Sequence, residues 1–300
     1  MLLPSNGRHF ACDRRRALGL VVFTLSILYF VSDTAAQTSL DDLRTKIASG
    51  SYEDKRDALV EIRRLQTADA SRIAIPALSD PNVMVRSSAA WAASFLPDQE
   101  ASKALVPLLS DKEPFVRIES ALALGVAQSS SATNALVDRL RQEKNNEARN
   151  AVAVALGDIG DMRAVDALTS VLKQKPNGSN EALRRSAARS IGQIAQMQLS
   201  GTTIIATPHS FLSEKYKPFK PAKTRENIEN SPAFRLAVGV LAKVLNNKRE
   251  SDDTRRETAF ALGAIGDPSS ADPLRSQLNS TDYYLVEVCK EALLKIGPAK

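Results

Sequence analysis

Two glycine-rich stretches have the residue types most suited to ligand chemistry, because paired glycines beside an acid occur in phosphate-binding and metal-binding loops. The stretch ALGDIGDMRA spans residues 155–164, and a near copy, ALGAIGDPSSA, spans residues 261–271. A phosphate loop needs its glycines after a strand and before a helix. Both stretches instead follow an apolar pattern of helical period. We therefore expect Gly160 and Gly266 to end a helix in the left-handed conformation and to bind no ligand.

Acid–arginine pairs with a spacing of six residues are a second candidate for acid–base chemistry. The pairs are Asp80 with Arg86, Asp111 with Arg117, and Glu143 with Arg149. An acid just before a helix can also cap free backbone amides and pair with an arginine further along. Because the pairs recur at regular intervals, we predict that they are structural and form a ladder along the repeated units.

Histidine and cysteine are too scarce to build the usual catalytic or metal sites. The histidines are His9 and His209, and the cysteines are Cys12 and Cys289. Metal sites draw on clusters of such side chains. We predict no catalytic residue, no metal ligand and no cofactor, and we expect Cys289 to be an inert packing residue. Trp91 is expected to lie in the core, or to be partly exposed near one end of the fold.

The composition indicates a folded helical protein without a nucleic-acid track. The chain is 43% hydrophobic and 25% charged, with only 5% aromatic residues. Abundant Ala and Leu favour closely packed helices over strands. Residues 1–36 hold four of the 40 basic and two of the 34 acidic residues, so the remainder carries a formal charge of +4. Because this charge is nearly balanced, we predict no nucleic-acid partner.

Residues 1–36 have the organisation of an export signal. A basic segment containing Arg14, Arg15 and Arg16 precedes an apolar run of 15 residues, and small residues lead up to Ala36. The run is shorter than the ~20 residues that a membrane helix needs. We therefore predict a signal peptide cleaved after Ala36 and export to the periplasm or the exterior. An uncleaved membrane anchor is the alternative.

The rest of the chain repeats. Anchor arginines lie eight residues before a glycine or its equivalent, and successive anchors are 30, 31, 32, 35 and 71 residues apart. The anchors are Arg56, Arg86, Arg117, Arg149, Arg184 and Arg255, with the glycines Gly125, Gly157, Gly192 and Gly263. Apolar residues at steps of three and four around each anchor indicate one helix, and leucines four apart indicate a second. Since neither helix can bury its apolar stripe alone, the units must stack.

The segments VRIESALALG, ARNAVAVALGDIGDMRAVDALTSVLKQ and TRRETAFALGAIGDPSSADPLRSQL resemble HEAT repeats of the phycobilisome-lyase-like subtype. The resemblance covers nearly all of residues 52–297. It implies an all-α, right-handed solenoid of about seven HEAT-like hairpins over residues 52–300, after a capping helix within residues 37–51. It also implies that the second helices line the concave face. HEAT-repeat deoxyhypusine hydroxylases hold iron through His-Glu pairs, and this sequence contains none.

The 71-residue step contains an insertion, which we place at residues 198–231. Its basic and aromatic side chains are Lys215, Tyr216, Lys217, Phe219, Lys220, Lys223 and Arg225. Such a surface suits an anionic glycan, a lipid headgroup or an acidic partner. A solvated loop without a ligand is the plainer interpretation, and both stay open.

These features predict a non-catalytic, exported scaffold that binds another protein through the concave face, aided by the insertion. Two alternatives belong to other classes. One is an accessory lyase-type or chaperone subunit for a cofactor-bearing protein. The other is a binder of anionic or membrane surfaces acting through residues 215–225.

Overall fold

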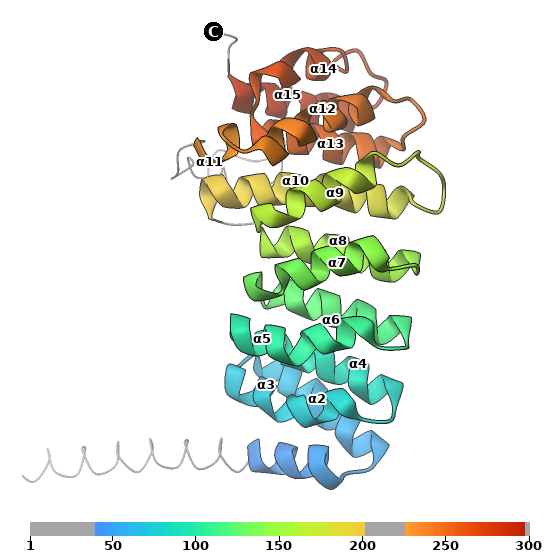
Figure 1. The fold of residues 1–300 in the computed structure, drawn as a ribbon, viewed down its shortest axis with the longest axis vertical. Coiled ribbons are helices and arrows are strands. Elements are labelled where there is room, and N and C mark those ends of the chain that lie inside the picture. The colour runs from blue at the N-terminus through green and yellow to red at the C-terminus, as the bar shows by residue number, and fades with distance from the viewer. Residues whose placement is uncertain (1–39, 202–225, 298–300) are drawn as a thin grey trace, which may run out of the picture.

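The computed structural model describes residues 40–201 and 226–297. Within these ranges the chain is all-α, and its helices pair and stack into an α-solenoid (Figure 1). Residues 1–39 and 202–225 lie outside the described residues, and with them the predicted signal peptide and the seven basic and aromatic residues of the insertion.

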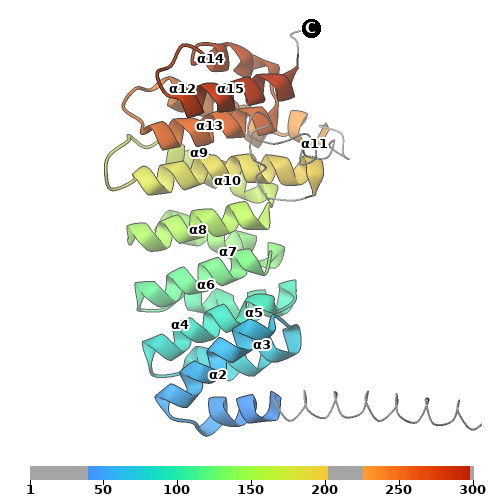
Figure 2. The ribbon, with the colours of Figure 1, turned by 180° about the vertical axis from the view of Figure 1, so that it is seen from behind.

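Each repeat unit contributes one helix to each of two layers, which Figures 1 and 2 show from opposite sides. The first helices of the units are α2 (Tyr52–Leu65), α4 (Val83–Ala92), α6 (Pro114–Val126), α8 (Asn146–Ile159), α10 (Glu181–Ser200), α13 (Asp252–Ile265) and α15 (Tyr283–Ile296). The second helices are α3 (Ala68–Ala74), α5 (Asp98–Leu105), α7 (Thr133–Gln142), α9 (Val165–Leu172), α12 (Pro232–Asn246) and α14 (Ala271–Arg275). A further helix over residues 40–49 packs Leu43 and Ile47 onto the first unit.

The two glycine-rich stretches end first helices, as predicted. Gly160 caps α8 with φ 74°, and Gly266 caps α13 with φ 73°. Both values lie in the left-handed region, where a side chain would be strained. Asp161 and Asp267 then accept hydrogen bonds from backbone amides two residues on and start the short 3-10 turn that leads into the second helix. The glycine pairs therefore serve the fold.

The anchor glycines have a separate role, because they let neighbouring first helices approach closely. A Cβ added at Gly125 would lie 3.0 Å from the Cα of Ala155 on α8. At Gly263 it would lie 2.7 Å from the Cα of Ala292 on α15. Alanines one turn earlier in the first helices, such as Ala121 and Ala259, are fully buried. Small residues thus set a tight spacing in the first-helix layer.

The insertion separates the two helices of the fifth unit. Helix α10 runs to Ser200 and is capped by Gly201 in the left-handed conformation. The chain resumes at α11 (Glu226–Glu229) and continues into α12, which lies beside α9 and α13. The stacking of the second helices therefore continues past the insertion.

Candidate protein-binding surface

The predicted ladder exists, but its partners differ from those expected. The Nε of Arg86 donates to Asp111 over 2.8 Å, and the Nε of Arg117 donates to Glu143 over 2.8 Å. Each anchor thus pairs with the connector that leaves its own unit. The acid six residues before Arg86 is Asp80. Arg86 donates a hydrogen bond to the backbone carbonyl of Asp80, over 2.9 Å, and not to its carboxylate. The expected pairing within each connector was therefore wrong, because the guanidinium fork reaches across the hairpin.

The anchor residue that we assigned in the first unit, Arg56, was also wrong. The carboxylate of Asp80 accepts a hydrogen bond from Lys55 Nζ over 2.7 Å, whereas Arg56 is exposed and pairs with Asp57. Lys55 therefore occupies the ladder position that we assigned to Arg56. Further along, Arg184 pairs with Glu250, both with about 2% of the side chain exposed. In the sixth unit Arg256 pairs with Asp282 over 2.9 Å, next to the anchor Arg255.

Two ladder acids, Glu143 and Asp111, are held charged, which suits a structural role. Burial alone would raise the pKa of Glu143, but hydrogen bonds from Arg117, from the Asn145 amide and from Arg139 outweigh it and lower that pKa to about 2. Burial also acts to raise the pKa of Asp111, but the hydrogen bonds from Arg86 outweigh it and the pKa is lowered. A permanently ionised, fully hydrogen-bonded carboxylate is a poor proton carrier. The ladder is therefore not a candidate active site.

The first helices present a surface that differs from that of the second helices. Outward-pointing residues of the second helices, such as Lys103, Asp138 and Asp166, are exposed. On the first helices, outward residues such as Leu122 and Phe260 stay half-buried between neighbouring helices. We call the outward surface of the first helices the first-helix face. That the second helices line the concave face stays a prediction.

A hollow of about 470 Å³ lies on this face between the first helices of the first three units. Its walls include Val60, Arg63, Trp91, Phe95 and Val126. The guanidinium carbon of Arg63 lies 4.4 Å from the centroid of the Trp91 ring, a cation–π contact. Val60 is 62% exposed and Val126 is 46% exposed. Trp91 is half-buried at the wall of this hollow, one of the two placements that we expected.

Glu119 adds an unsatisfied acceptor to the same face. Its Oε2 is buried without a hydrogen-bond partner. Burial raises the pKa of the Glu119 carboxyl, and the charge of Arg63 opposes that rise. A buried acceptor without a donor costs about 1–3 kcal/mol. Sequence reasoning missed Glu119, because a single glutamate on a helix gives no signal until its neighbours are known.

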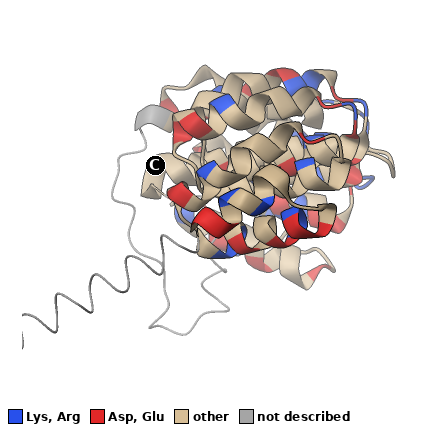
Figure 3. Ribbon diagram, turned by 90° about the horizontal axis from the view of Figure 1, so that it is seen from below, with Lys and Arg blue, Asp and Glu red and all other residues tan. Residues whose placement is uncertain are grey.

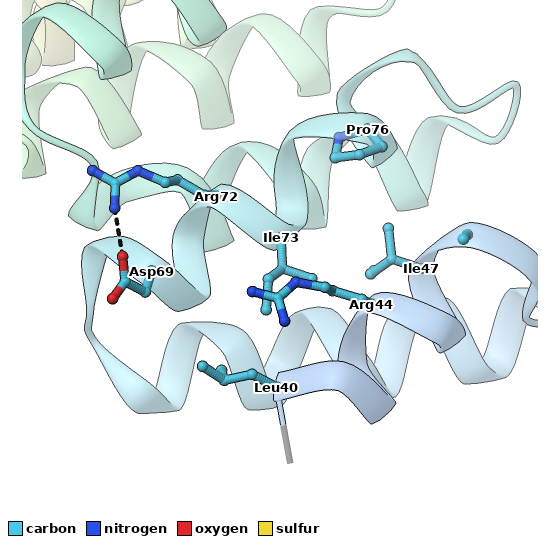
Figure 4. A pocket seen from close by; sticks show the side chains of 8 residues that line it. Leu40, Arg44, Ile47, Asp69, Arg72, Ile73 and Pro76 are labelled. Atoms are coloured by element: carbon cyan, nitrogen blue, oxygen red, sulfur yellow. Dashed lines mark hydrogen bonds and ion pairs between the residues drawn. The ribbon is translucent and has the colours of Figure 1, made fainter. Parts of the chain in front are cut away.

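A second hollow, of about 450 Å³, lies between the helix at 40–49 and α3 (Figure 4). Leu40, Ile73 and Arg44 line it, and Arg72 at its rim pairs with Asp69. Arg72 also forms a two-pronged ion pair with Glu100, with both hydrogen bonds at 2.8 Å. Because its charged groups already pair with one another, this hollow leaves less for a partner to satisfy than the one beside Trp91.

Comparison with protein families identifies the repeats. HEAT-repeat models match residues 40–125, 102–178 and 133–209, and a PBS lyase HEAT-like repeat matches residues 254–280. The chain is a HEAT-repeat protein. No curated protein matches it.

Among solved structures, an engineered protein shares 20% identity with this HEAT-repeat protein at a TM-score of 0.52, covering 86% of this chain and 68% of the other. The complex of CpcE and CpcF of phycocyanin lyase from Nostoc shares 20% identity at a TM-score of 0.46, covering 84% and 86%. A designed armadillo repeat protein shares 14% identity at a TM-score of 0.44, covering 86% and 100%. The first of these likenesses supports the fold alone.

The other candidate features of the HEAT-repeat protein are Cys289, the surface charges, metal ligands and membrane spans. Cys289 is fully buried, and burial raises the pKa of its thiol to about 12. Basic and acidic residues are interspersed when the solenoid is viewed along its axis (Figure 3). Over residues 40–201 and 226–297, no three His, Cys, Asp or Glu side chains gather closely enough to hold a metal ion. Across those same ranges, no helix has both the length and the apolar character of a membrane span.

Proposed function

We propose that this HEAT-repeat protein is a non-catalytic, exported scaffold that binds another protein through the first-helix face. The hollow walled by Trp91, Phe95 and Val126 is the main contact. One observation carries the proposal: exposed Val60 and Val126 surround the hollow in which Arg63 is stacked on Trp91. An exposed apolar surface of this kind marks a protein-binding site.

The arrangement specifies the chemistry of the partner. An apolar side chain of the partner fills the hollow and packs against Trp91. Arg63 is already stacked on Trp91, so its charge is fixed before binding and little side-chain entropy is lost. Aromatic and arginine side chains of this kind supply most of the energy in protein interfaces.

Photo-crosslinking from single sites tests which face binds. A photoreactive amino acid at Val60 places the probe on the first-helix face, and one at Asp138 places it on the second-helix face. We expect a specific adduct from position 60 that Trp91→Ala abolishes, and none from position 138. An adduct from position 138 alone would contradict the proposed face. Intact mass and N-terminal sequencing of the exported chain test cleavage after Ala36.

The two alternative functions predict different results when the same protein and its crosslinked adduct are tested. An accessory subunit of a cofactor-bearing protein would capture a partner that carries a chromophore, visible in the absorbance spectrum of the adduct. A binder of anionic membranes would sediment with anionic vesicles in a salt-sensitive way, and deletion of residues 198–231 would abolish this. If the scaffold proposal is correct, neither property accompanies the adduct from position 60.

A further inference from the structure

One unit of the ladder lacks its acid. In the first three units, Lys55, Arg86 and Arg117 each pair with a carboxylate on the connector that leaves the unit. The fifth and sixth units do the same through Glu250 and Asp282. In the fourth unit the anchor is Arg149, and its connector, residues 173–180 with the sequence KQKPNGSN, contains no acid. Lys175 stands three residues after the last leucine of the second helix, where the preceding unit has Glu143.

The structure shows the consequence for the Arg149 guanidinium. Its Nε donates to the backbone carbonyl of Leu140 over 3.1 Å. Among the described residues, no carboxylate lies within ion-pair distance of it, and neither Nη donates a hydrogen bond to the protein. Glu147 and Glu181, the acids that flank this edge in sequence, do not reach it. Glu143 is already occupied by Arg117 and Arg139.

The missing acid is not replaced by another internal group. The next anchor uses carbonyls at the end of α9 and on the fourth connector, since Arg184 donates to Leu172 over 3.0 Å and also to Gln174. Lys173 and Lys175 on that connector are exposed and add two further positive charges. The connector forms a wide loop at the edge of the column, between α9 and α10 (Figure 1).

We propose that Arg149 is a binding site for a carboxylate side chain of a partner protein, which occupies the place of the missing ladder acid. Arg86 and Arg117 show what such a site does in this fold, because each holds its carboxylate with two hydrogen bonds of 2.8–3.0 Å. An arginine fork suits a carboxylate better than a lysine does, because its parallel N–H groups match the two oxygens. The lysines of the connector steer an acidic segment to this edge.

This site lies on the turn edge of the solenoid, apart from the first-helix face, so it goes beyond the proposed function. If binding at Arg149 fails, the result leaves the tests at Trp91 and Val60 unaffected. The converse also holds. The two proposals are therefore decided separately.

The test uses the full chain and a fluorescent hexaglutamate peptide at low ionic strength. We expect Arg149→Gln to weaken peptide binding about tenfold, the effect of losing one charge-assisted, two-pronged contact. Lys175→Glu supplies the missing acid from within the chain. This substitution should weaken peptide binding to a similar extent and raise the thermal midpoint of unfolding by about 2–4 °C. Gln174→Glu repeats this test from the adjacent position.

Lys103→Glu is the control, because it makes the same change of charge on an exposed residue of α5. It should leave both the peptide affinity and the thermal midpoint close to those of the wild type. Equal peptide binding by wild type and Arg149→Gln would overturn the proposal. So would Lys175→Glu and Gln174→Glu both behaving like Lys103→Glu. If inorganic phosphate binds Arg149 and hexaglutamate does not, the site takes small anions and the protein partner is rejected.

Discussion

Arg117 and Glu143 lie 26 residues apart and are joined by two parallel hydrogen bonds, Nε to Oε2 at 2.8 Å and Nη2 to Oε1 at 2.9 Å. The same glutamate accepts from the amide of Asn145 over 2.8 Å and therefore caps the approach to α8. One side chain thus closes the third unit and positions the first helix of the fourth. Glu143 is the point where local capping and repeat stacking depend on the same atoms.

Replacing Glu143 with Gln should lower the free energy of unfolding by about 3 kcal/mol. The substitution leaves Arg117 and Arg139 at a nearly dry site without a counter-charge, and breaking one side of a buried ion pair has this cost. Urea denaturation at pH 7 measures it. Asp138→Asn is the matched control, because Asp138 is exposed and its pair with Arg141 contributes little. Equal losses in the two variants would contradict the ladder's role in stability.

The same glutamate predicts how stability changes with pH. Its pKa falls from 4.5 to about 2 in the folded chain. A lowered pKa means that the unfolded chain binds the proton first on acidification. The stabilisation is therefore complete above about pH 4.5 and disappears as the pH approaches 2. The stability difference between wild type and Glu143→Gln should shrink between pH 5 and pH 3. A difference that stays constant over this window would show that Glu143 does not titrate as described.

Glycine-to-alanine changes at two positions should have opposite signs. At Gly263 the added Cβ meets the backbone of α15 at 2.7 Å, so the helices must separate, with an expected loss of about 1–3 kcal/mol. At Gly239, inside α12, nothing lies within 4 Å, and alanine should add about 0.5–1 kcal/mol through its better helix propensity. Thermal unfolding of both variants checks the signs. Two losses of equal size would show that close approach is not what selects Gly263.

The repeat itself could be predicted from sequence because it depends on local rules. Helix stripes, capping glycines and stacking follow from residue spacing, and Gly160 and Gly266 adopt the expected left-handed conformation. The HEAT family, the all-α class and the solenoid are confirmed. These features need only neighbours in sequence or in the adjacent unit.

Pairings across the hairpin could not be predicted with the same rules. The spacing between Asp80 and Arg86 suggested one ion pair, but the choice between two connectors depends on where the guanidinium fork points. The surroundings of the unpaired Glu119 oxygen depend on another helix, since the charge of Arg63 on α2 acts on this carboxyl. Which helices line the concave face stays a prediction, because residue spacing alone does not give the direction in which the stack curves.

Cys289 should label only when the C-terminal units open. Its side chain is fully buried and burial raises its pKa to about 12, so the reactive thiolate is both rare and shielded. We expect a thiol reagent at pH 8 to modify Cys289 at a rate that rises steeply with urea. Peptide mass spectrometry distinguishes this site from Cys12. Gly263→Ala should speed the labelling of Cys289, since it loosens the contact between α13 and α15. Rapid labelling of the wild type without urea would contradict the packing of α15.

Glu119 has a buried oxygen without a hydrogen-bond partner, and its replacement by Gln should raise stability without changing binding. Loss of the desolvated charge should raise the free energy of unfolding at pH 7. The sign follows from the raised pKa, because a carboxyl that is easier to protonate in the folded state destabilises the fold once it is ionised. The variant should be more stable and should form the adduct expected from position 60 to the same extent as the wild type, because the replaced oxygen is buried. Asp166→Asn, on the opposite layer, should change neither property. A Glu119→Gln variant that is not stabilised would contradict the raised pKa, and a lost adduct would contradict the burial of this oxygen.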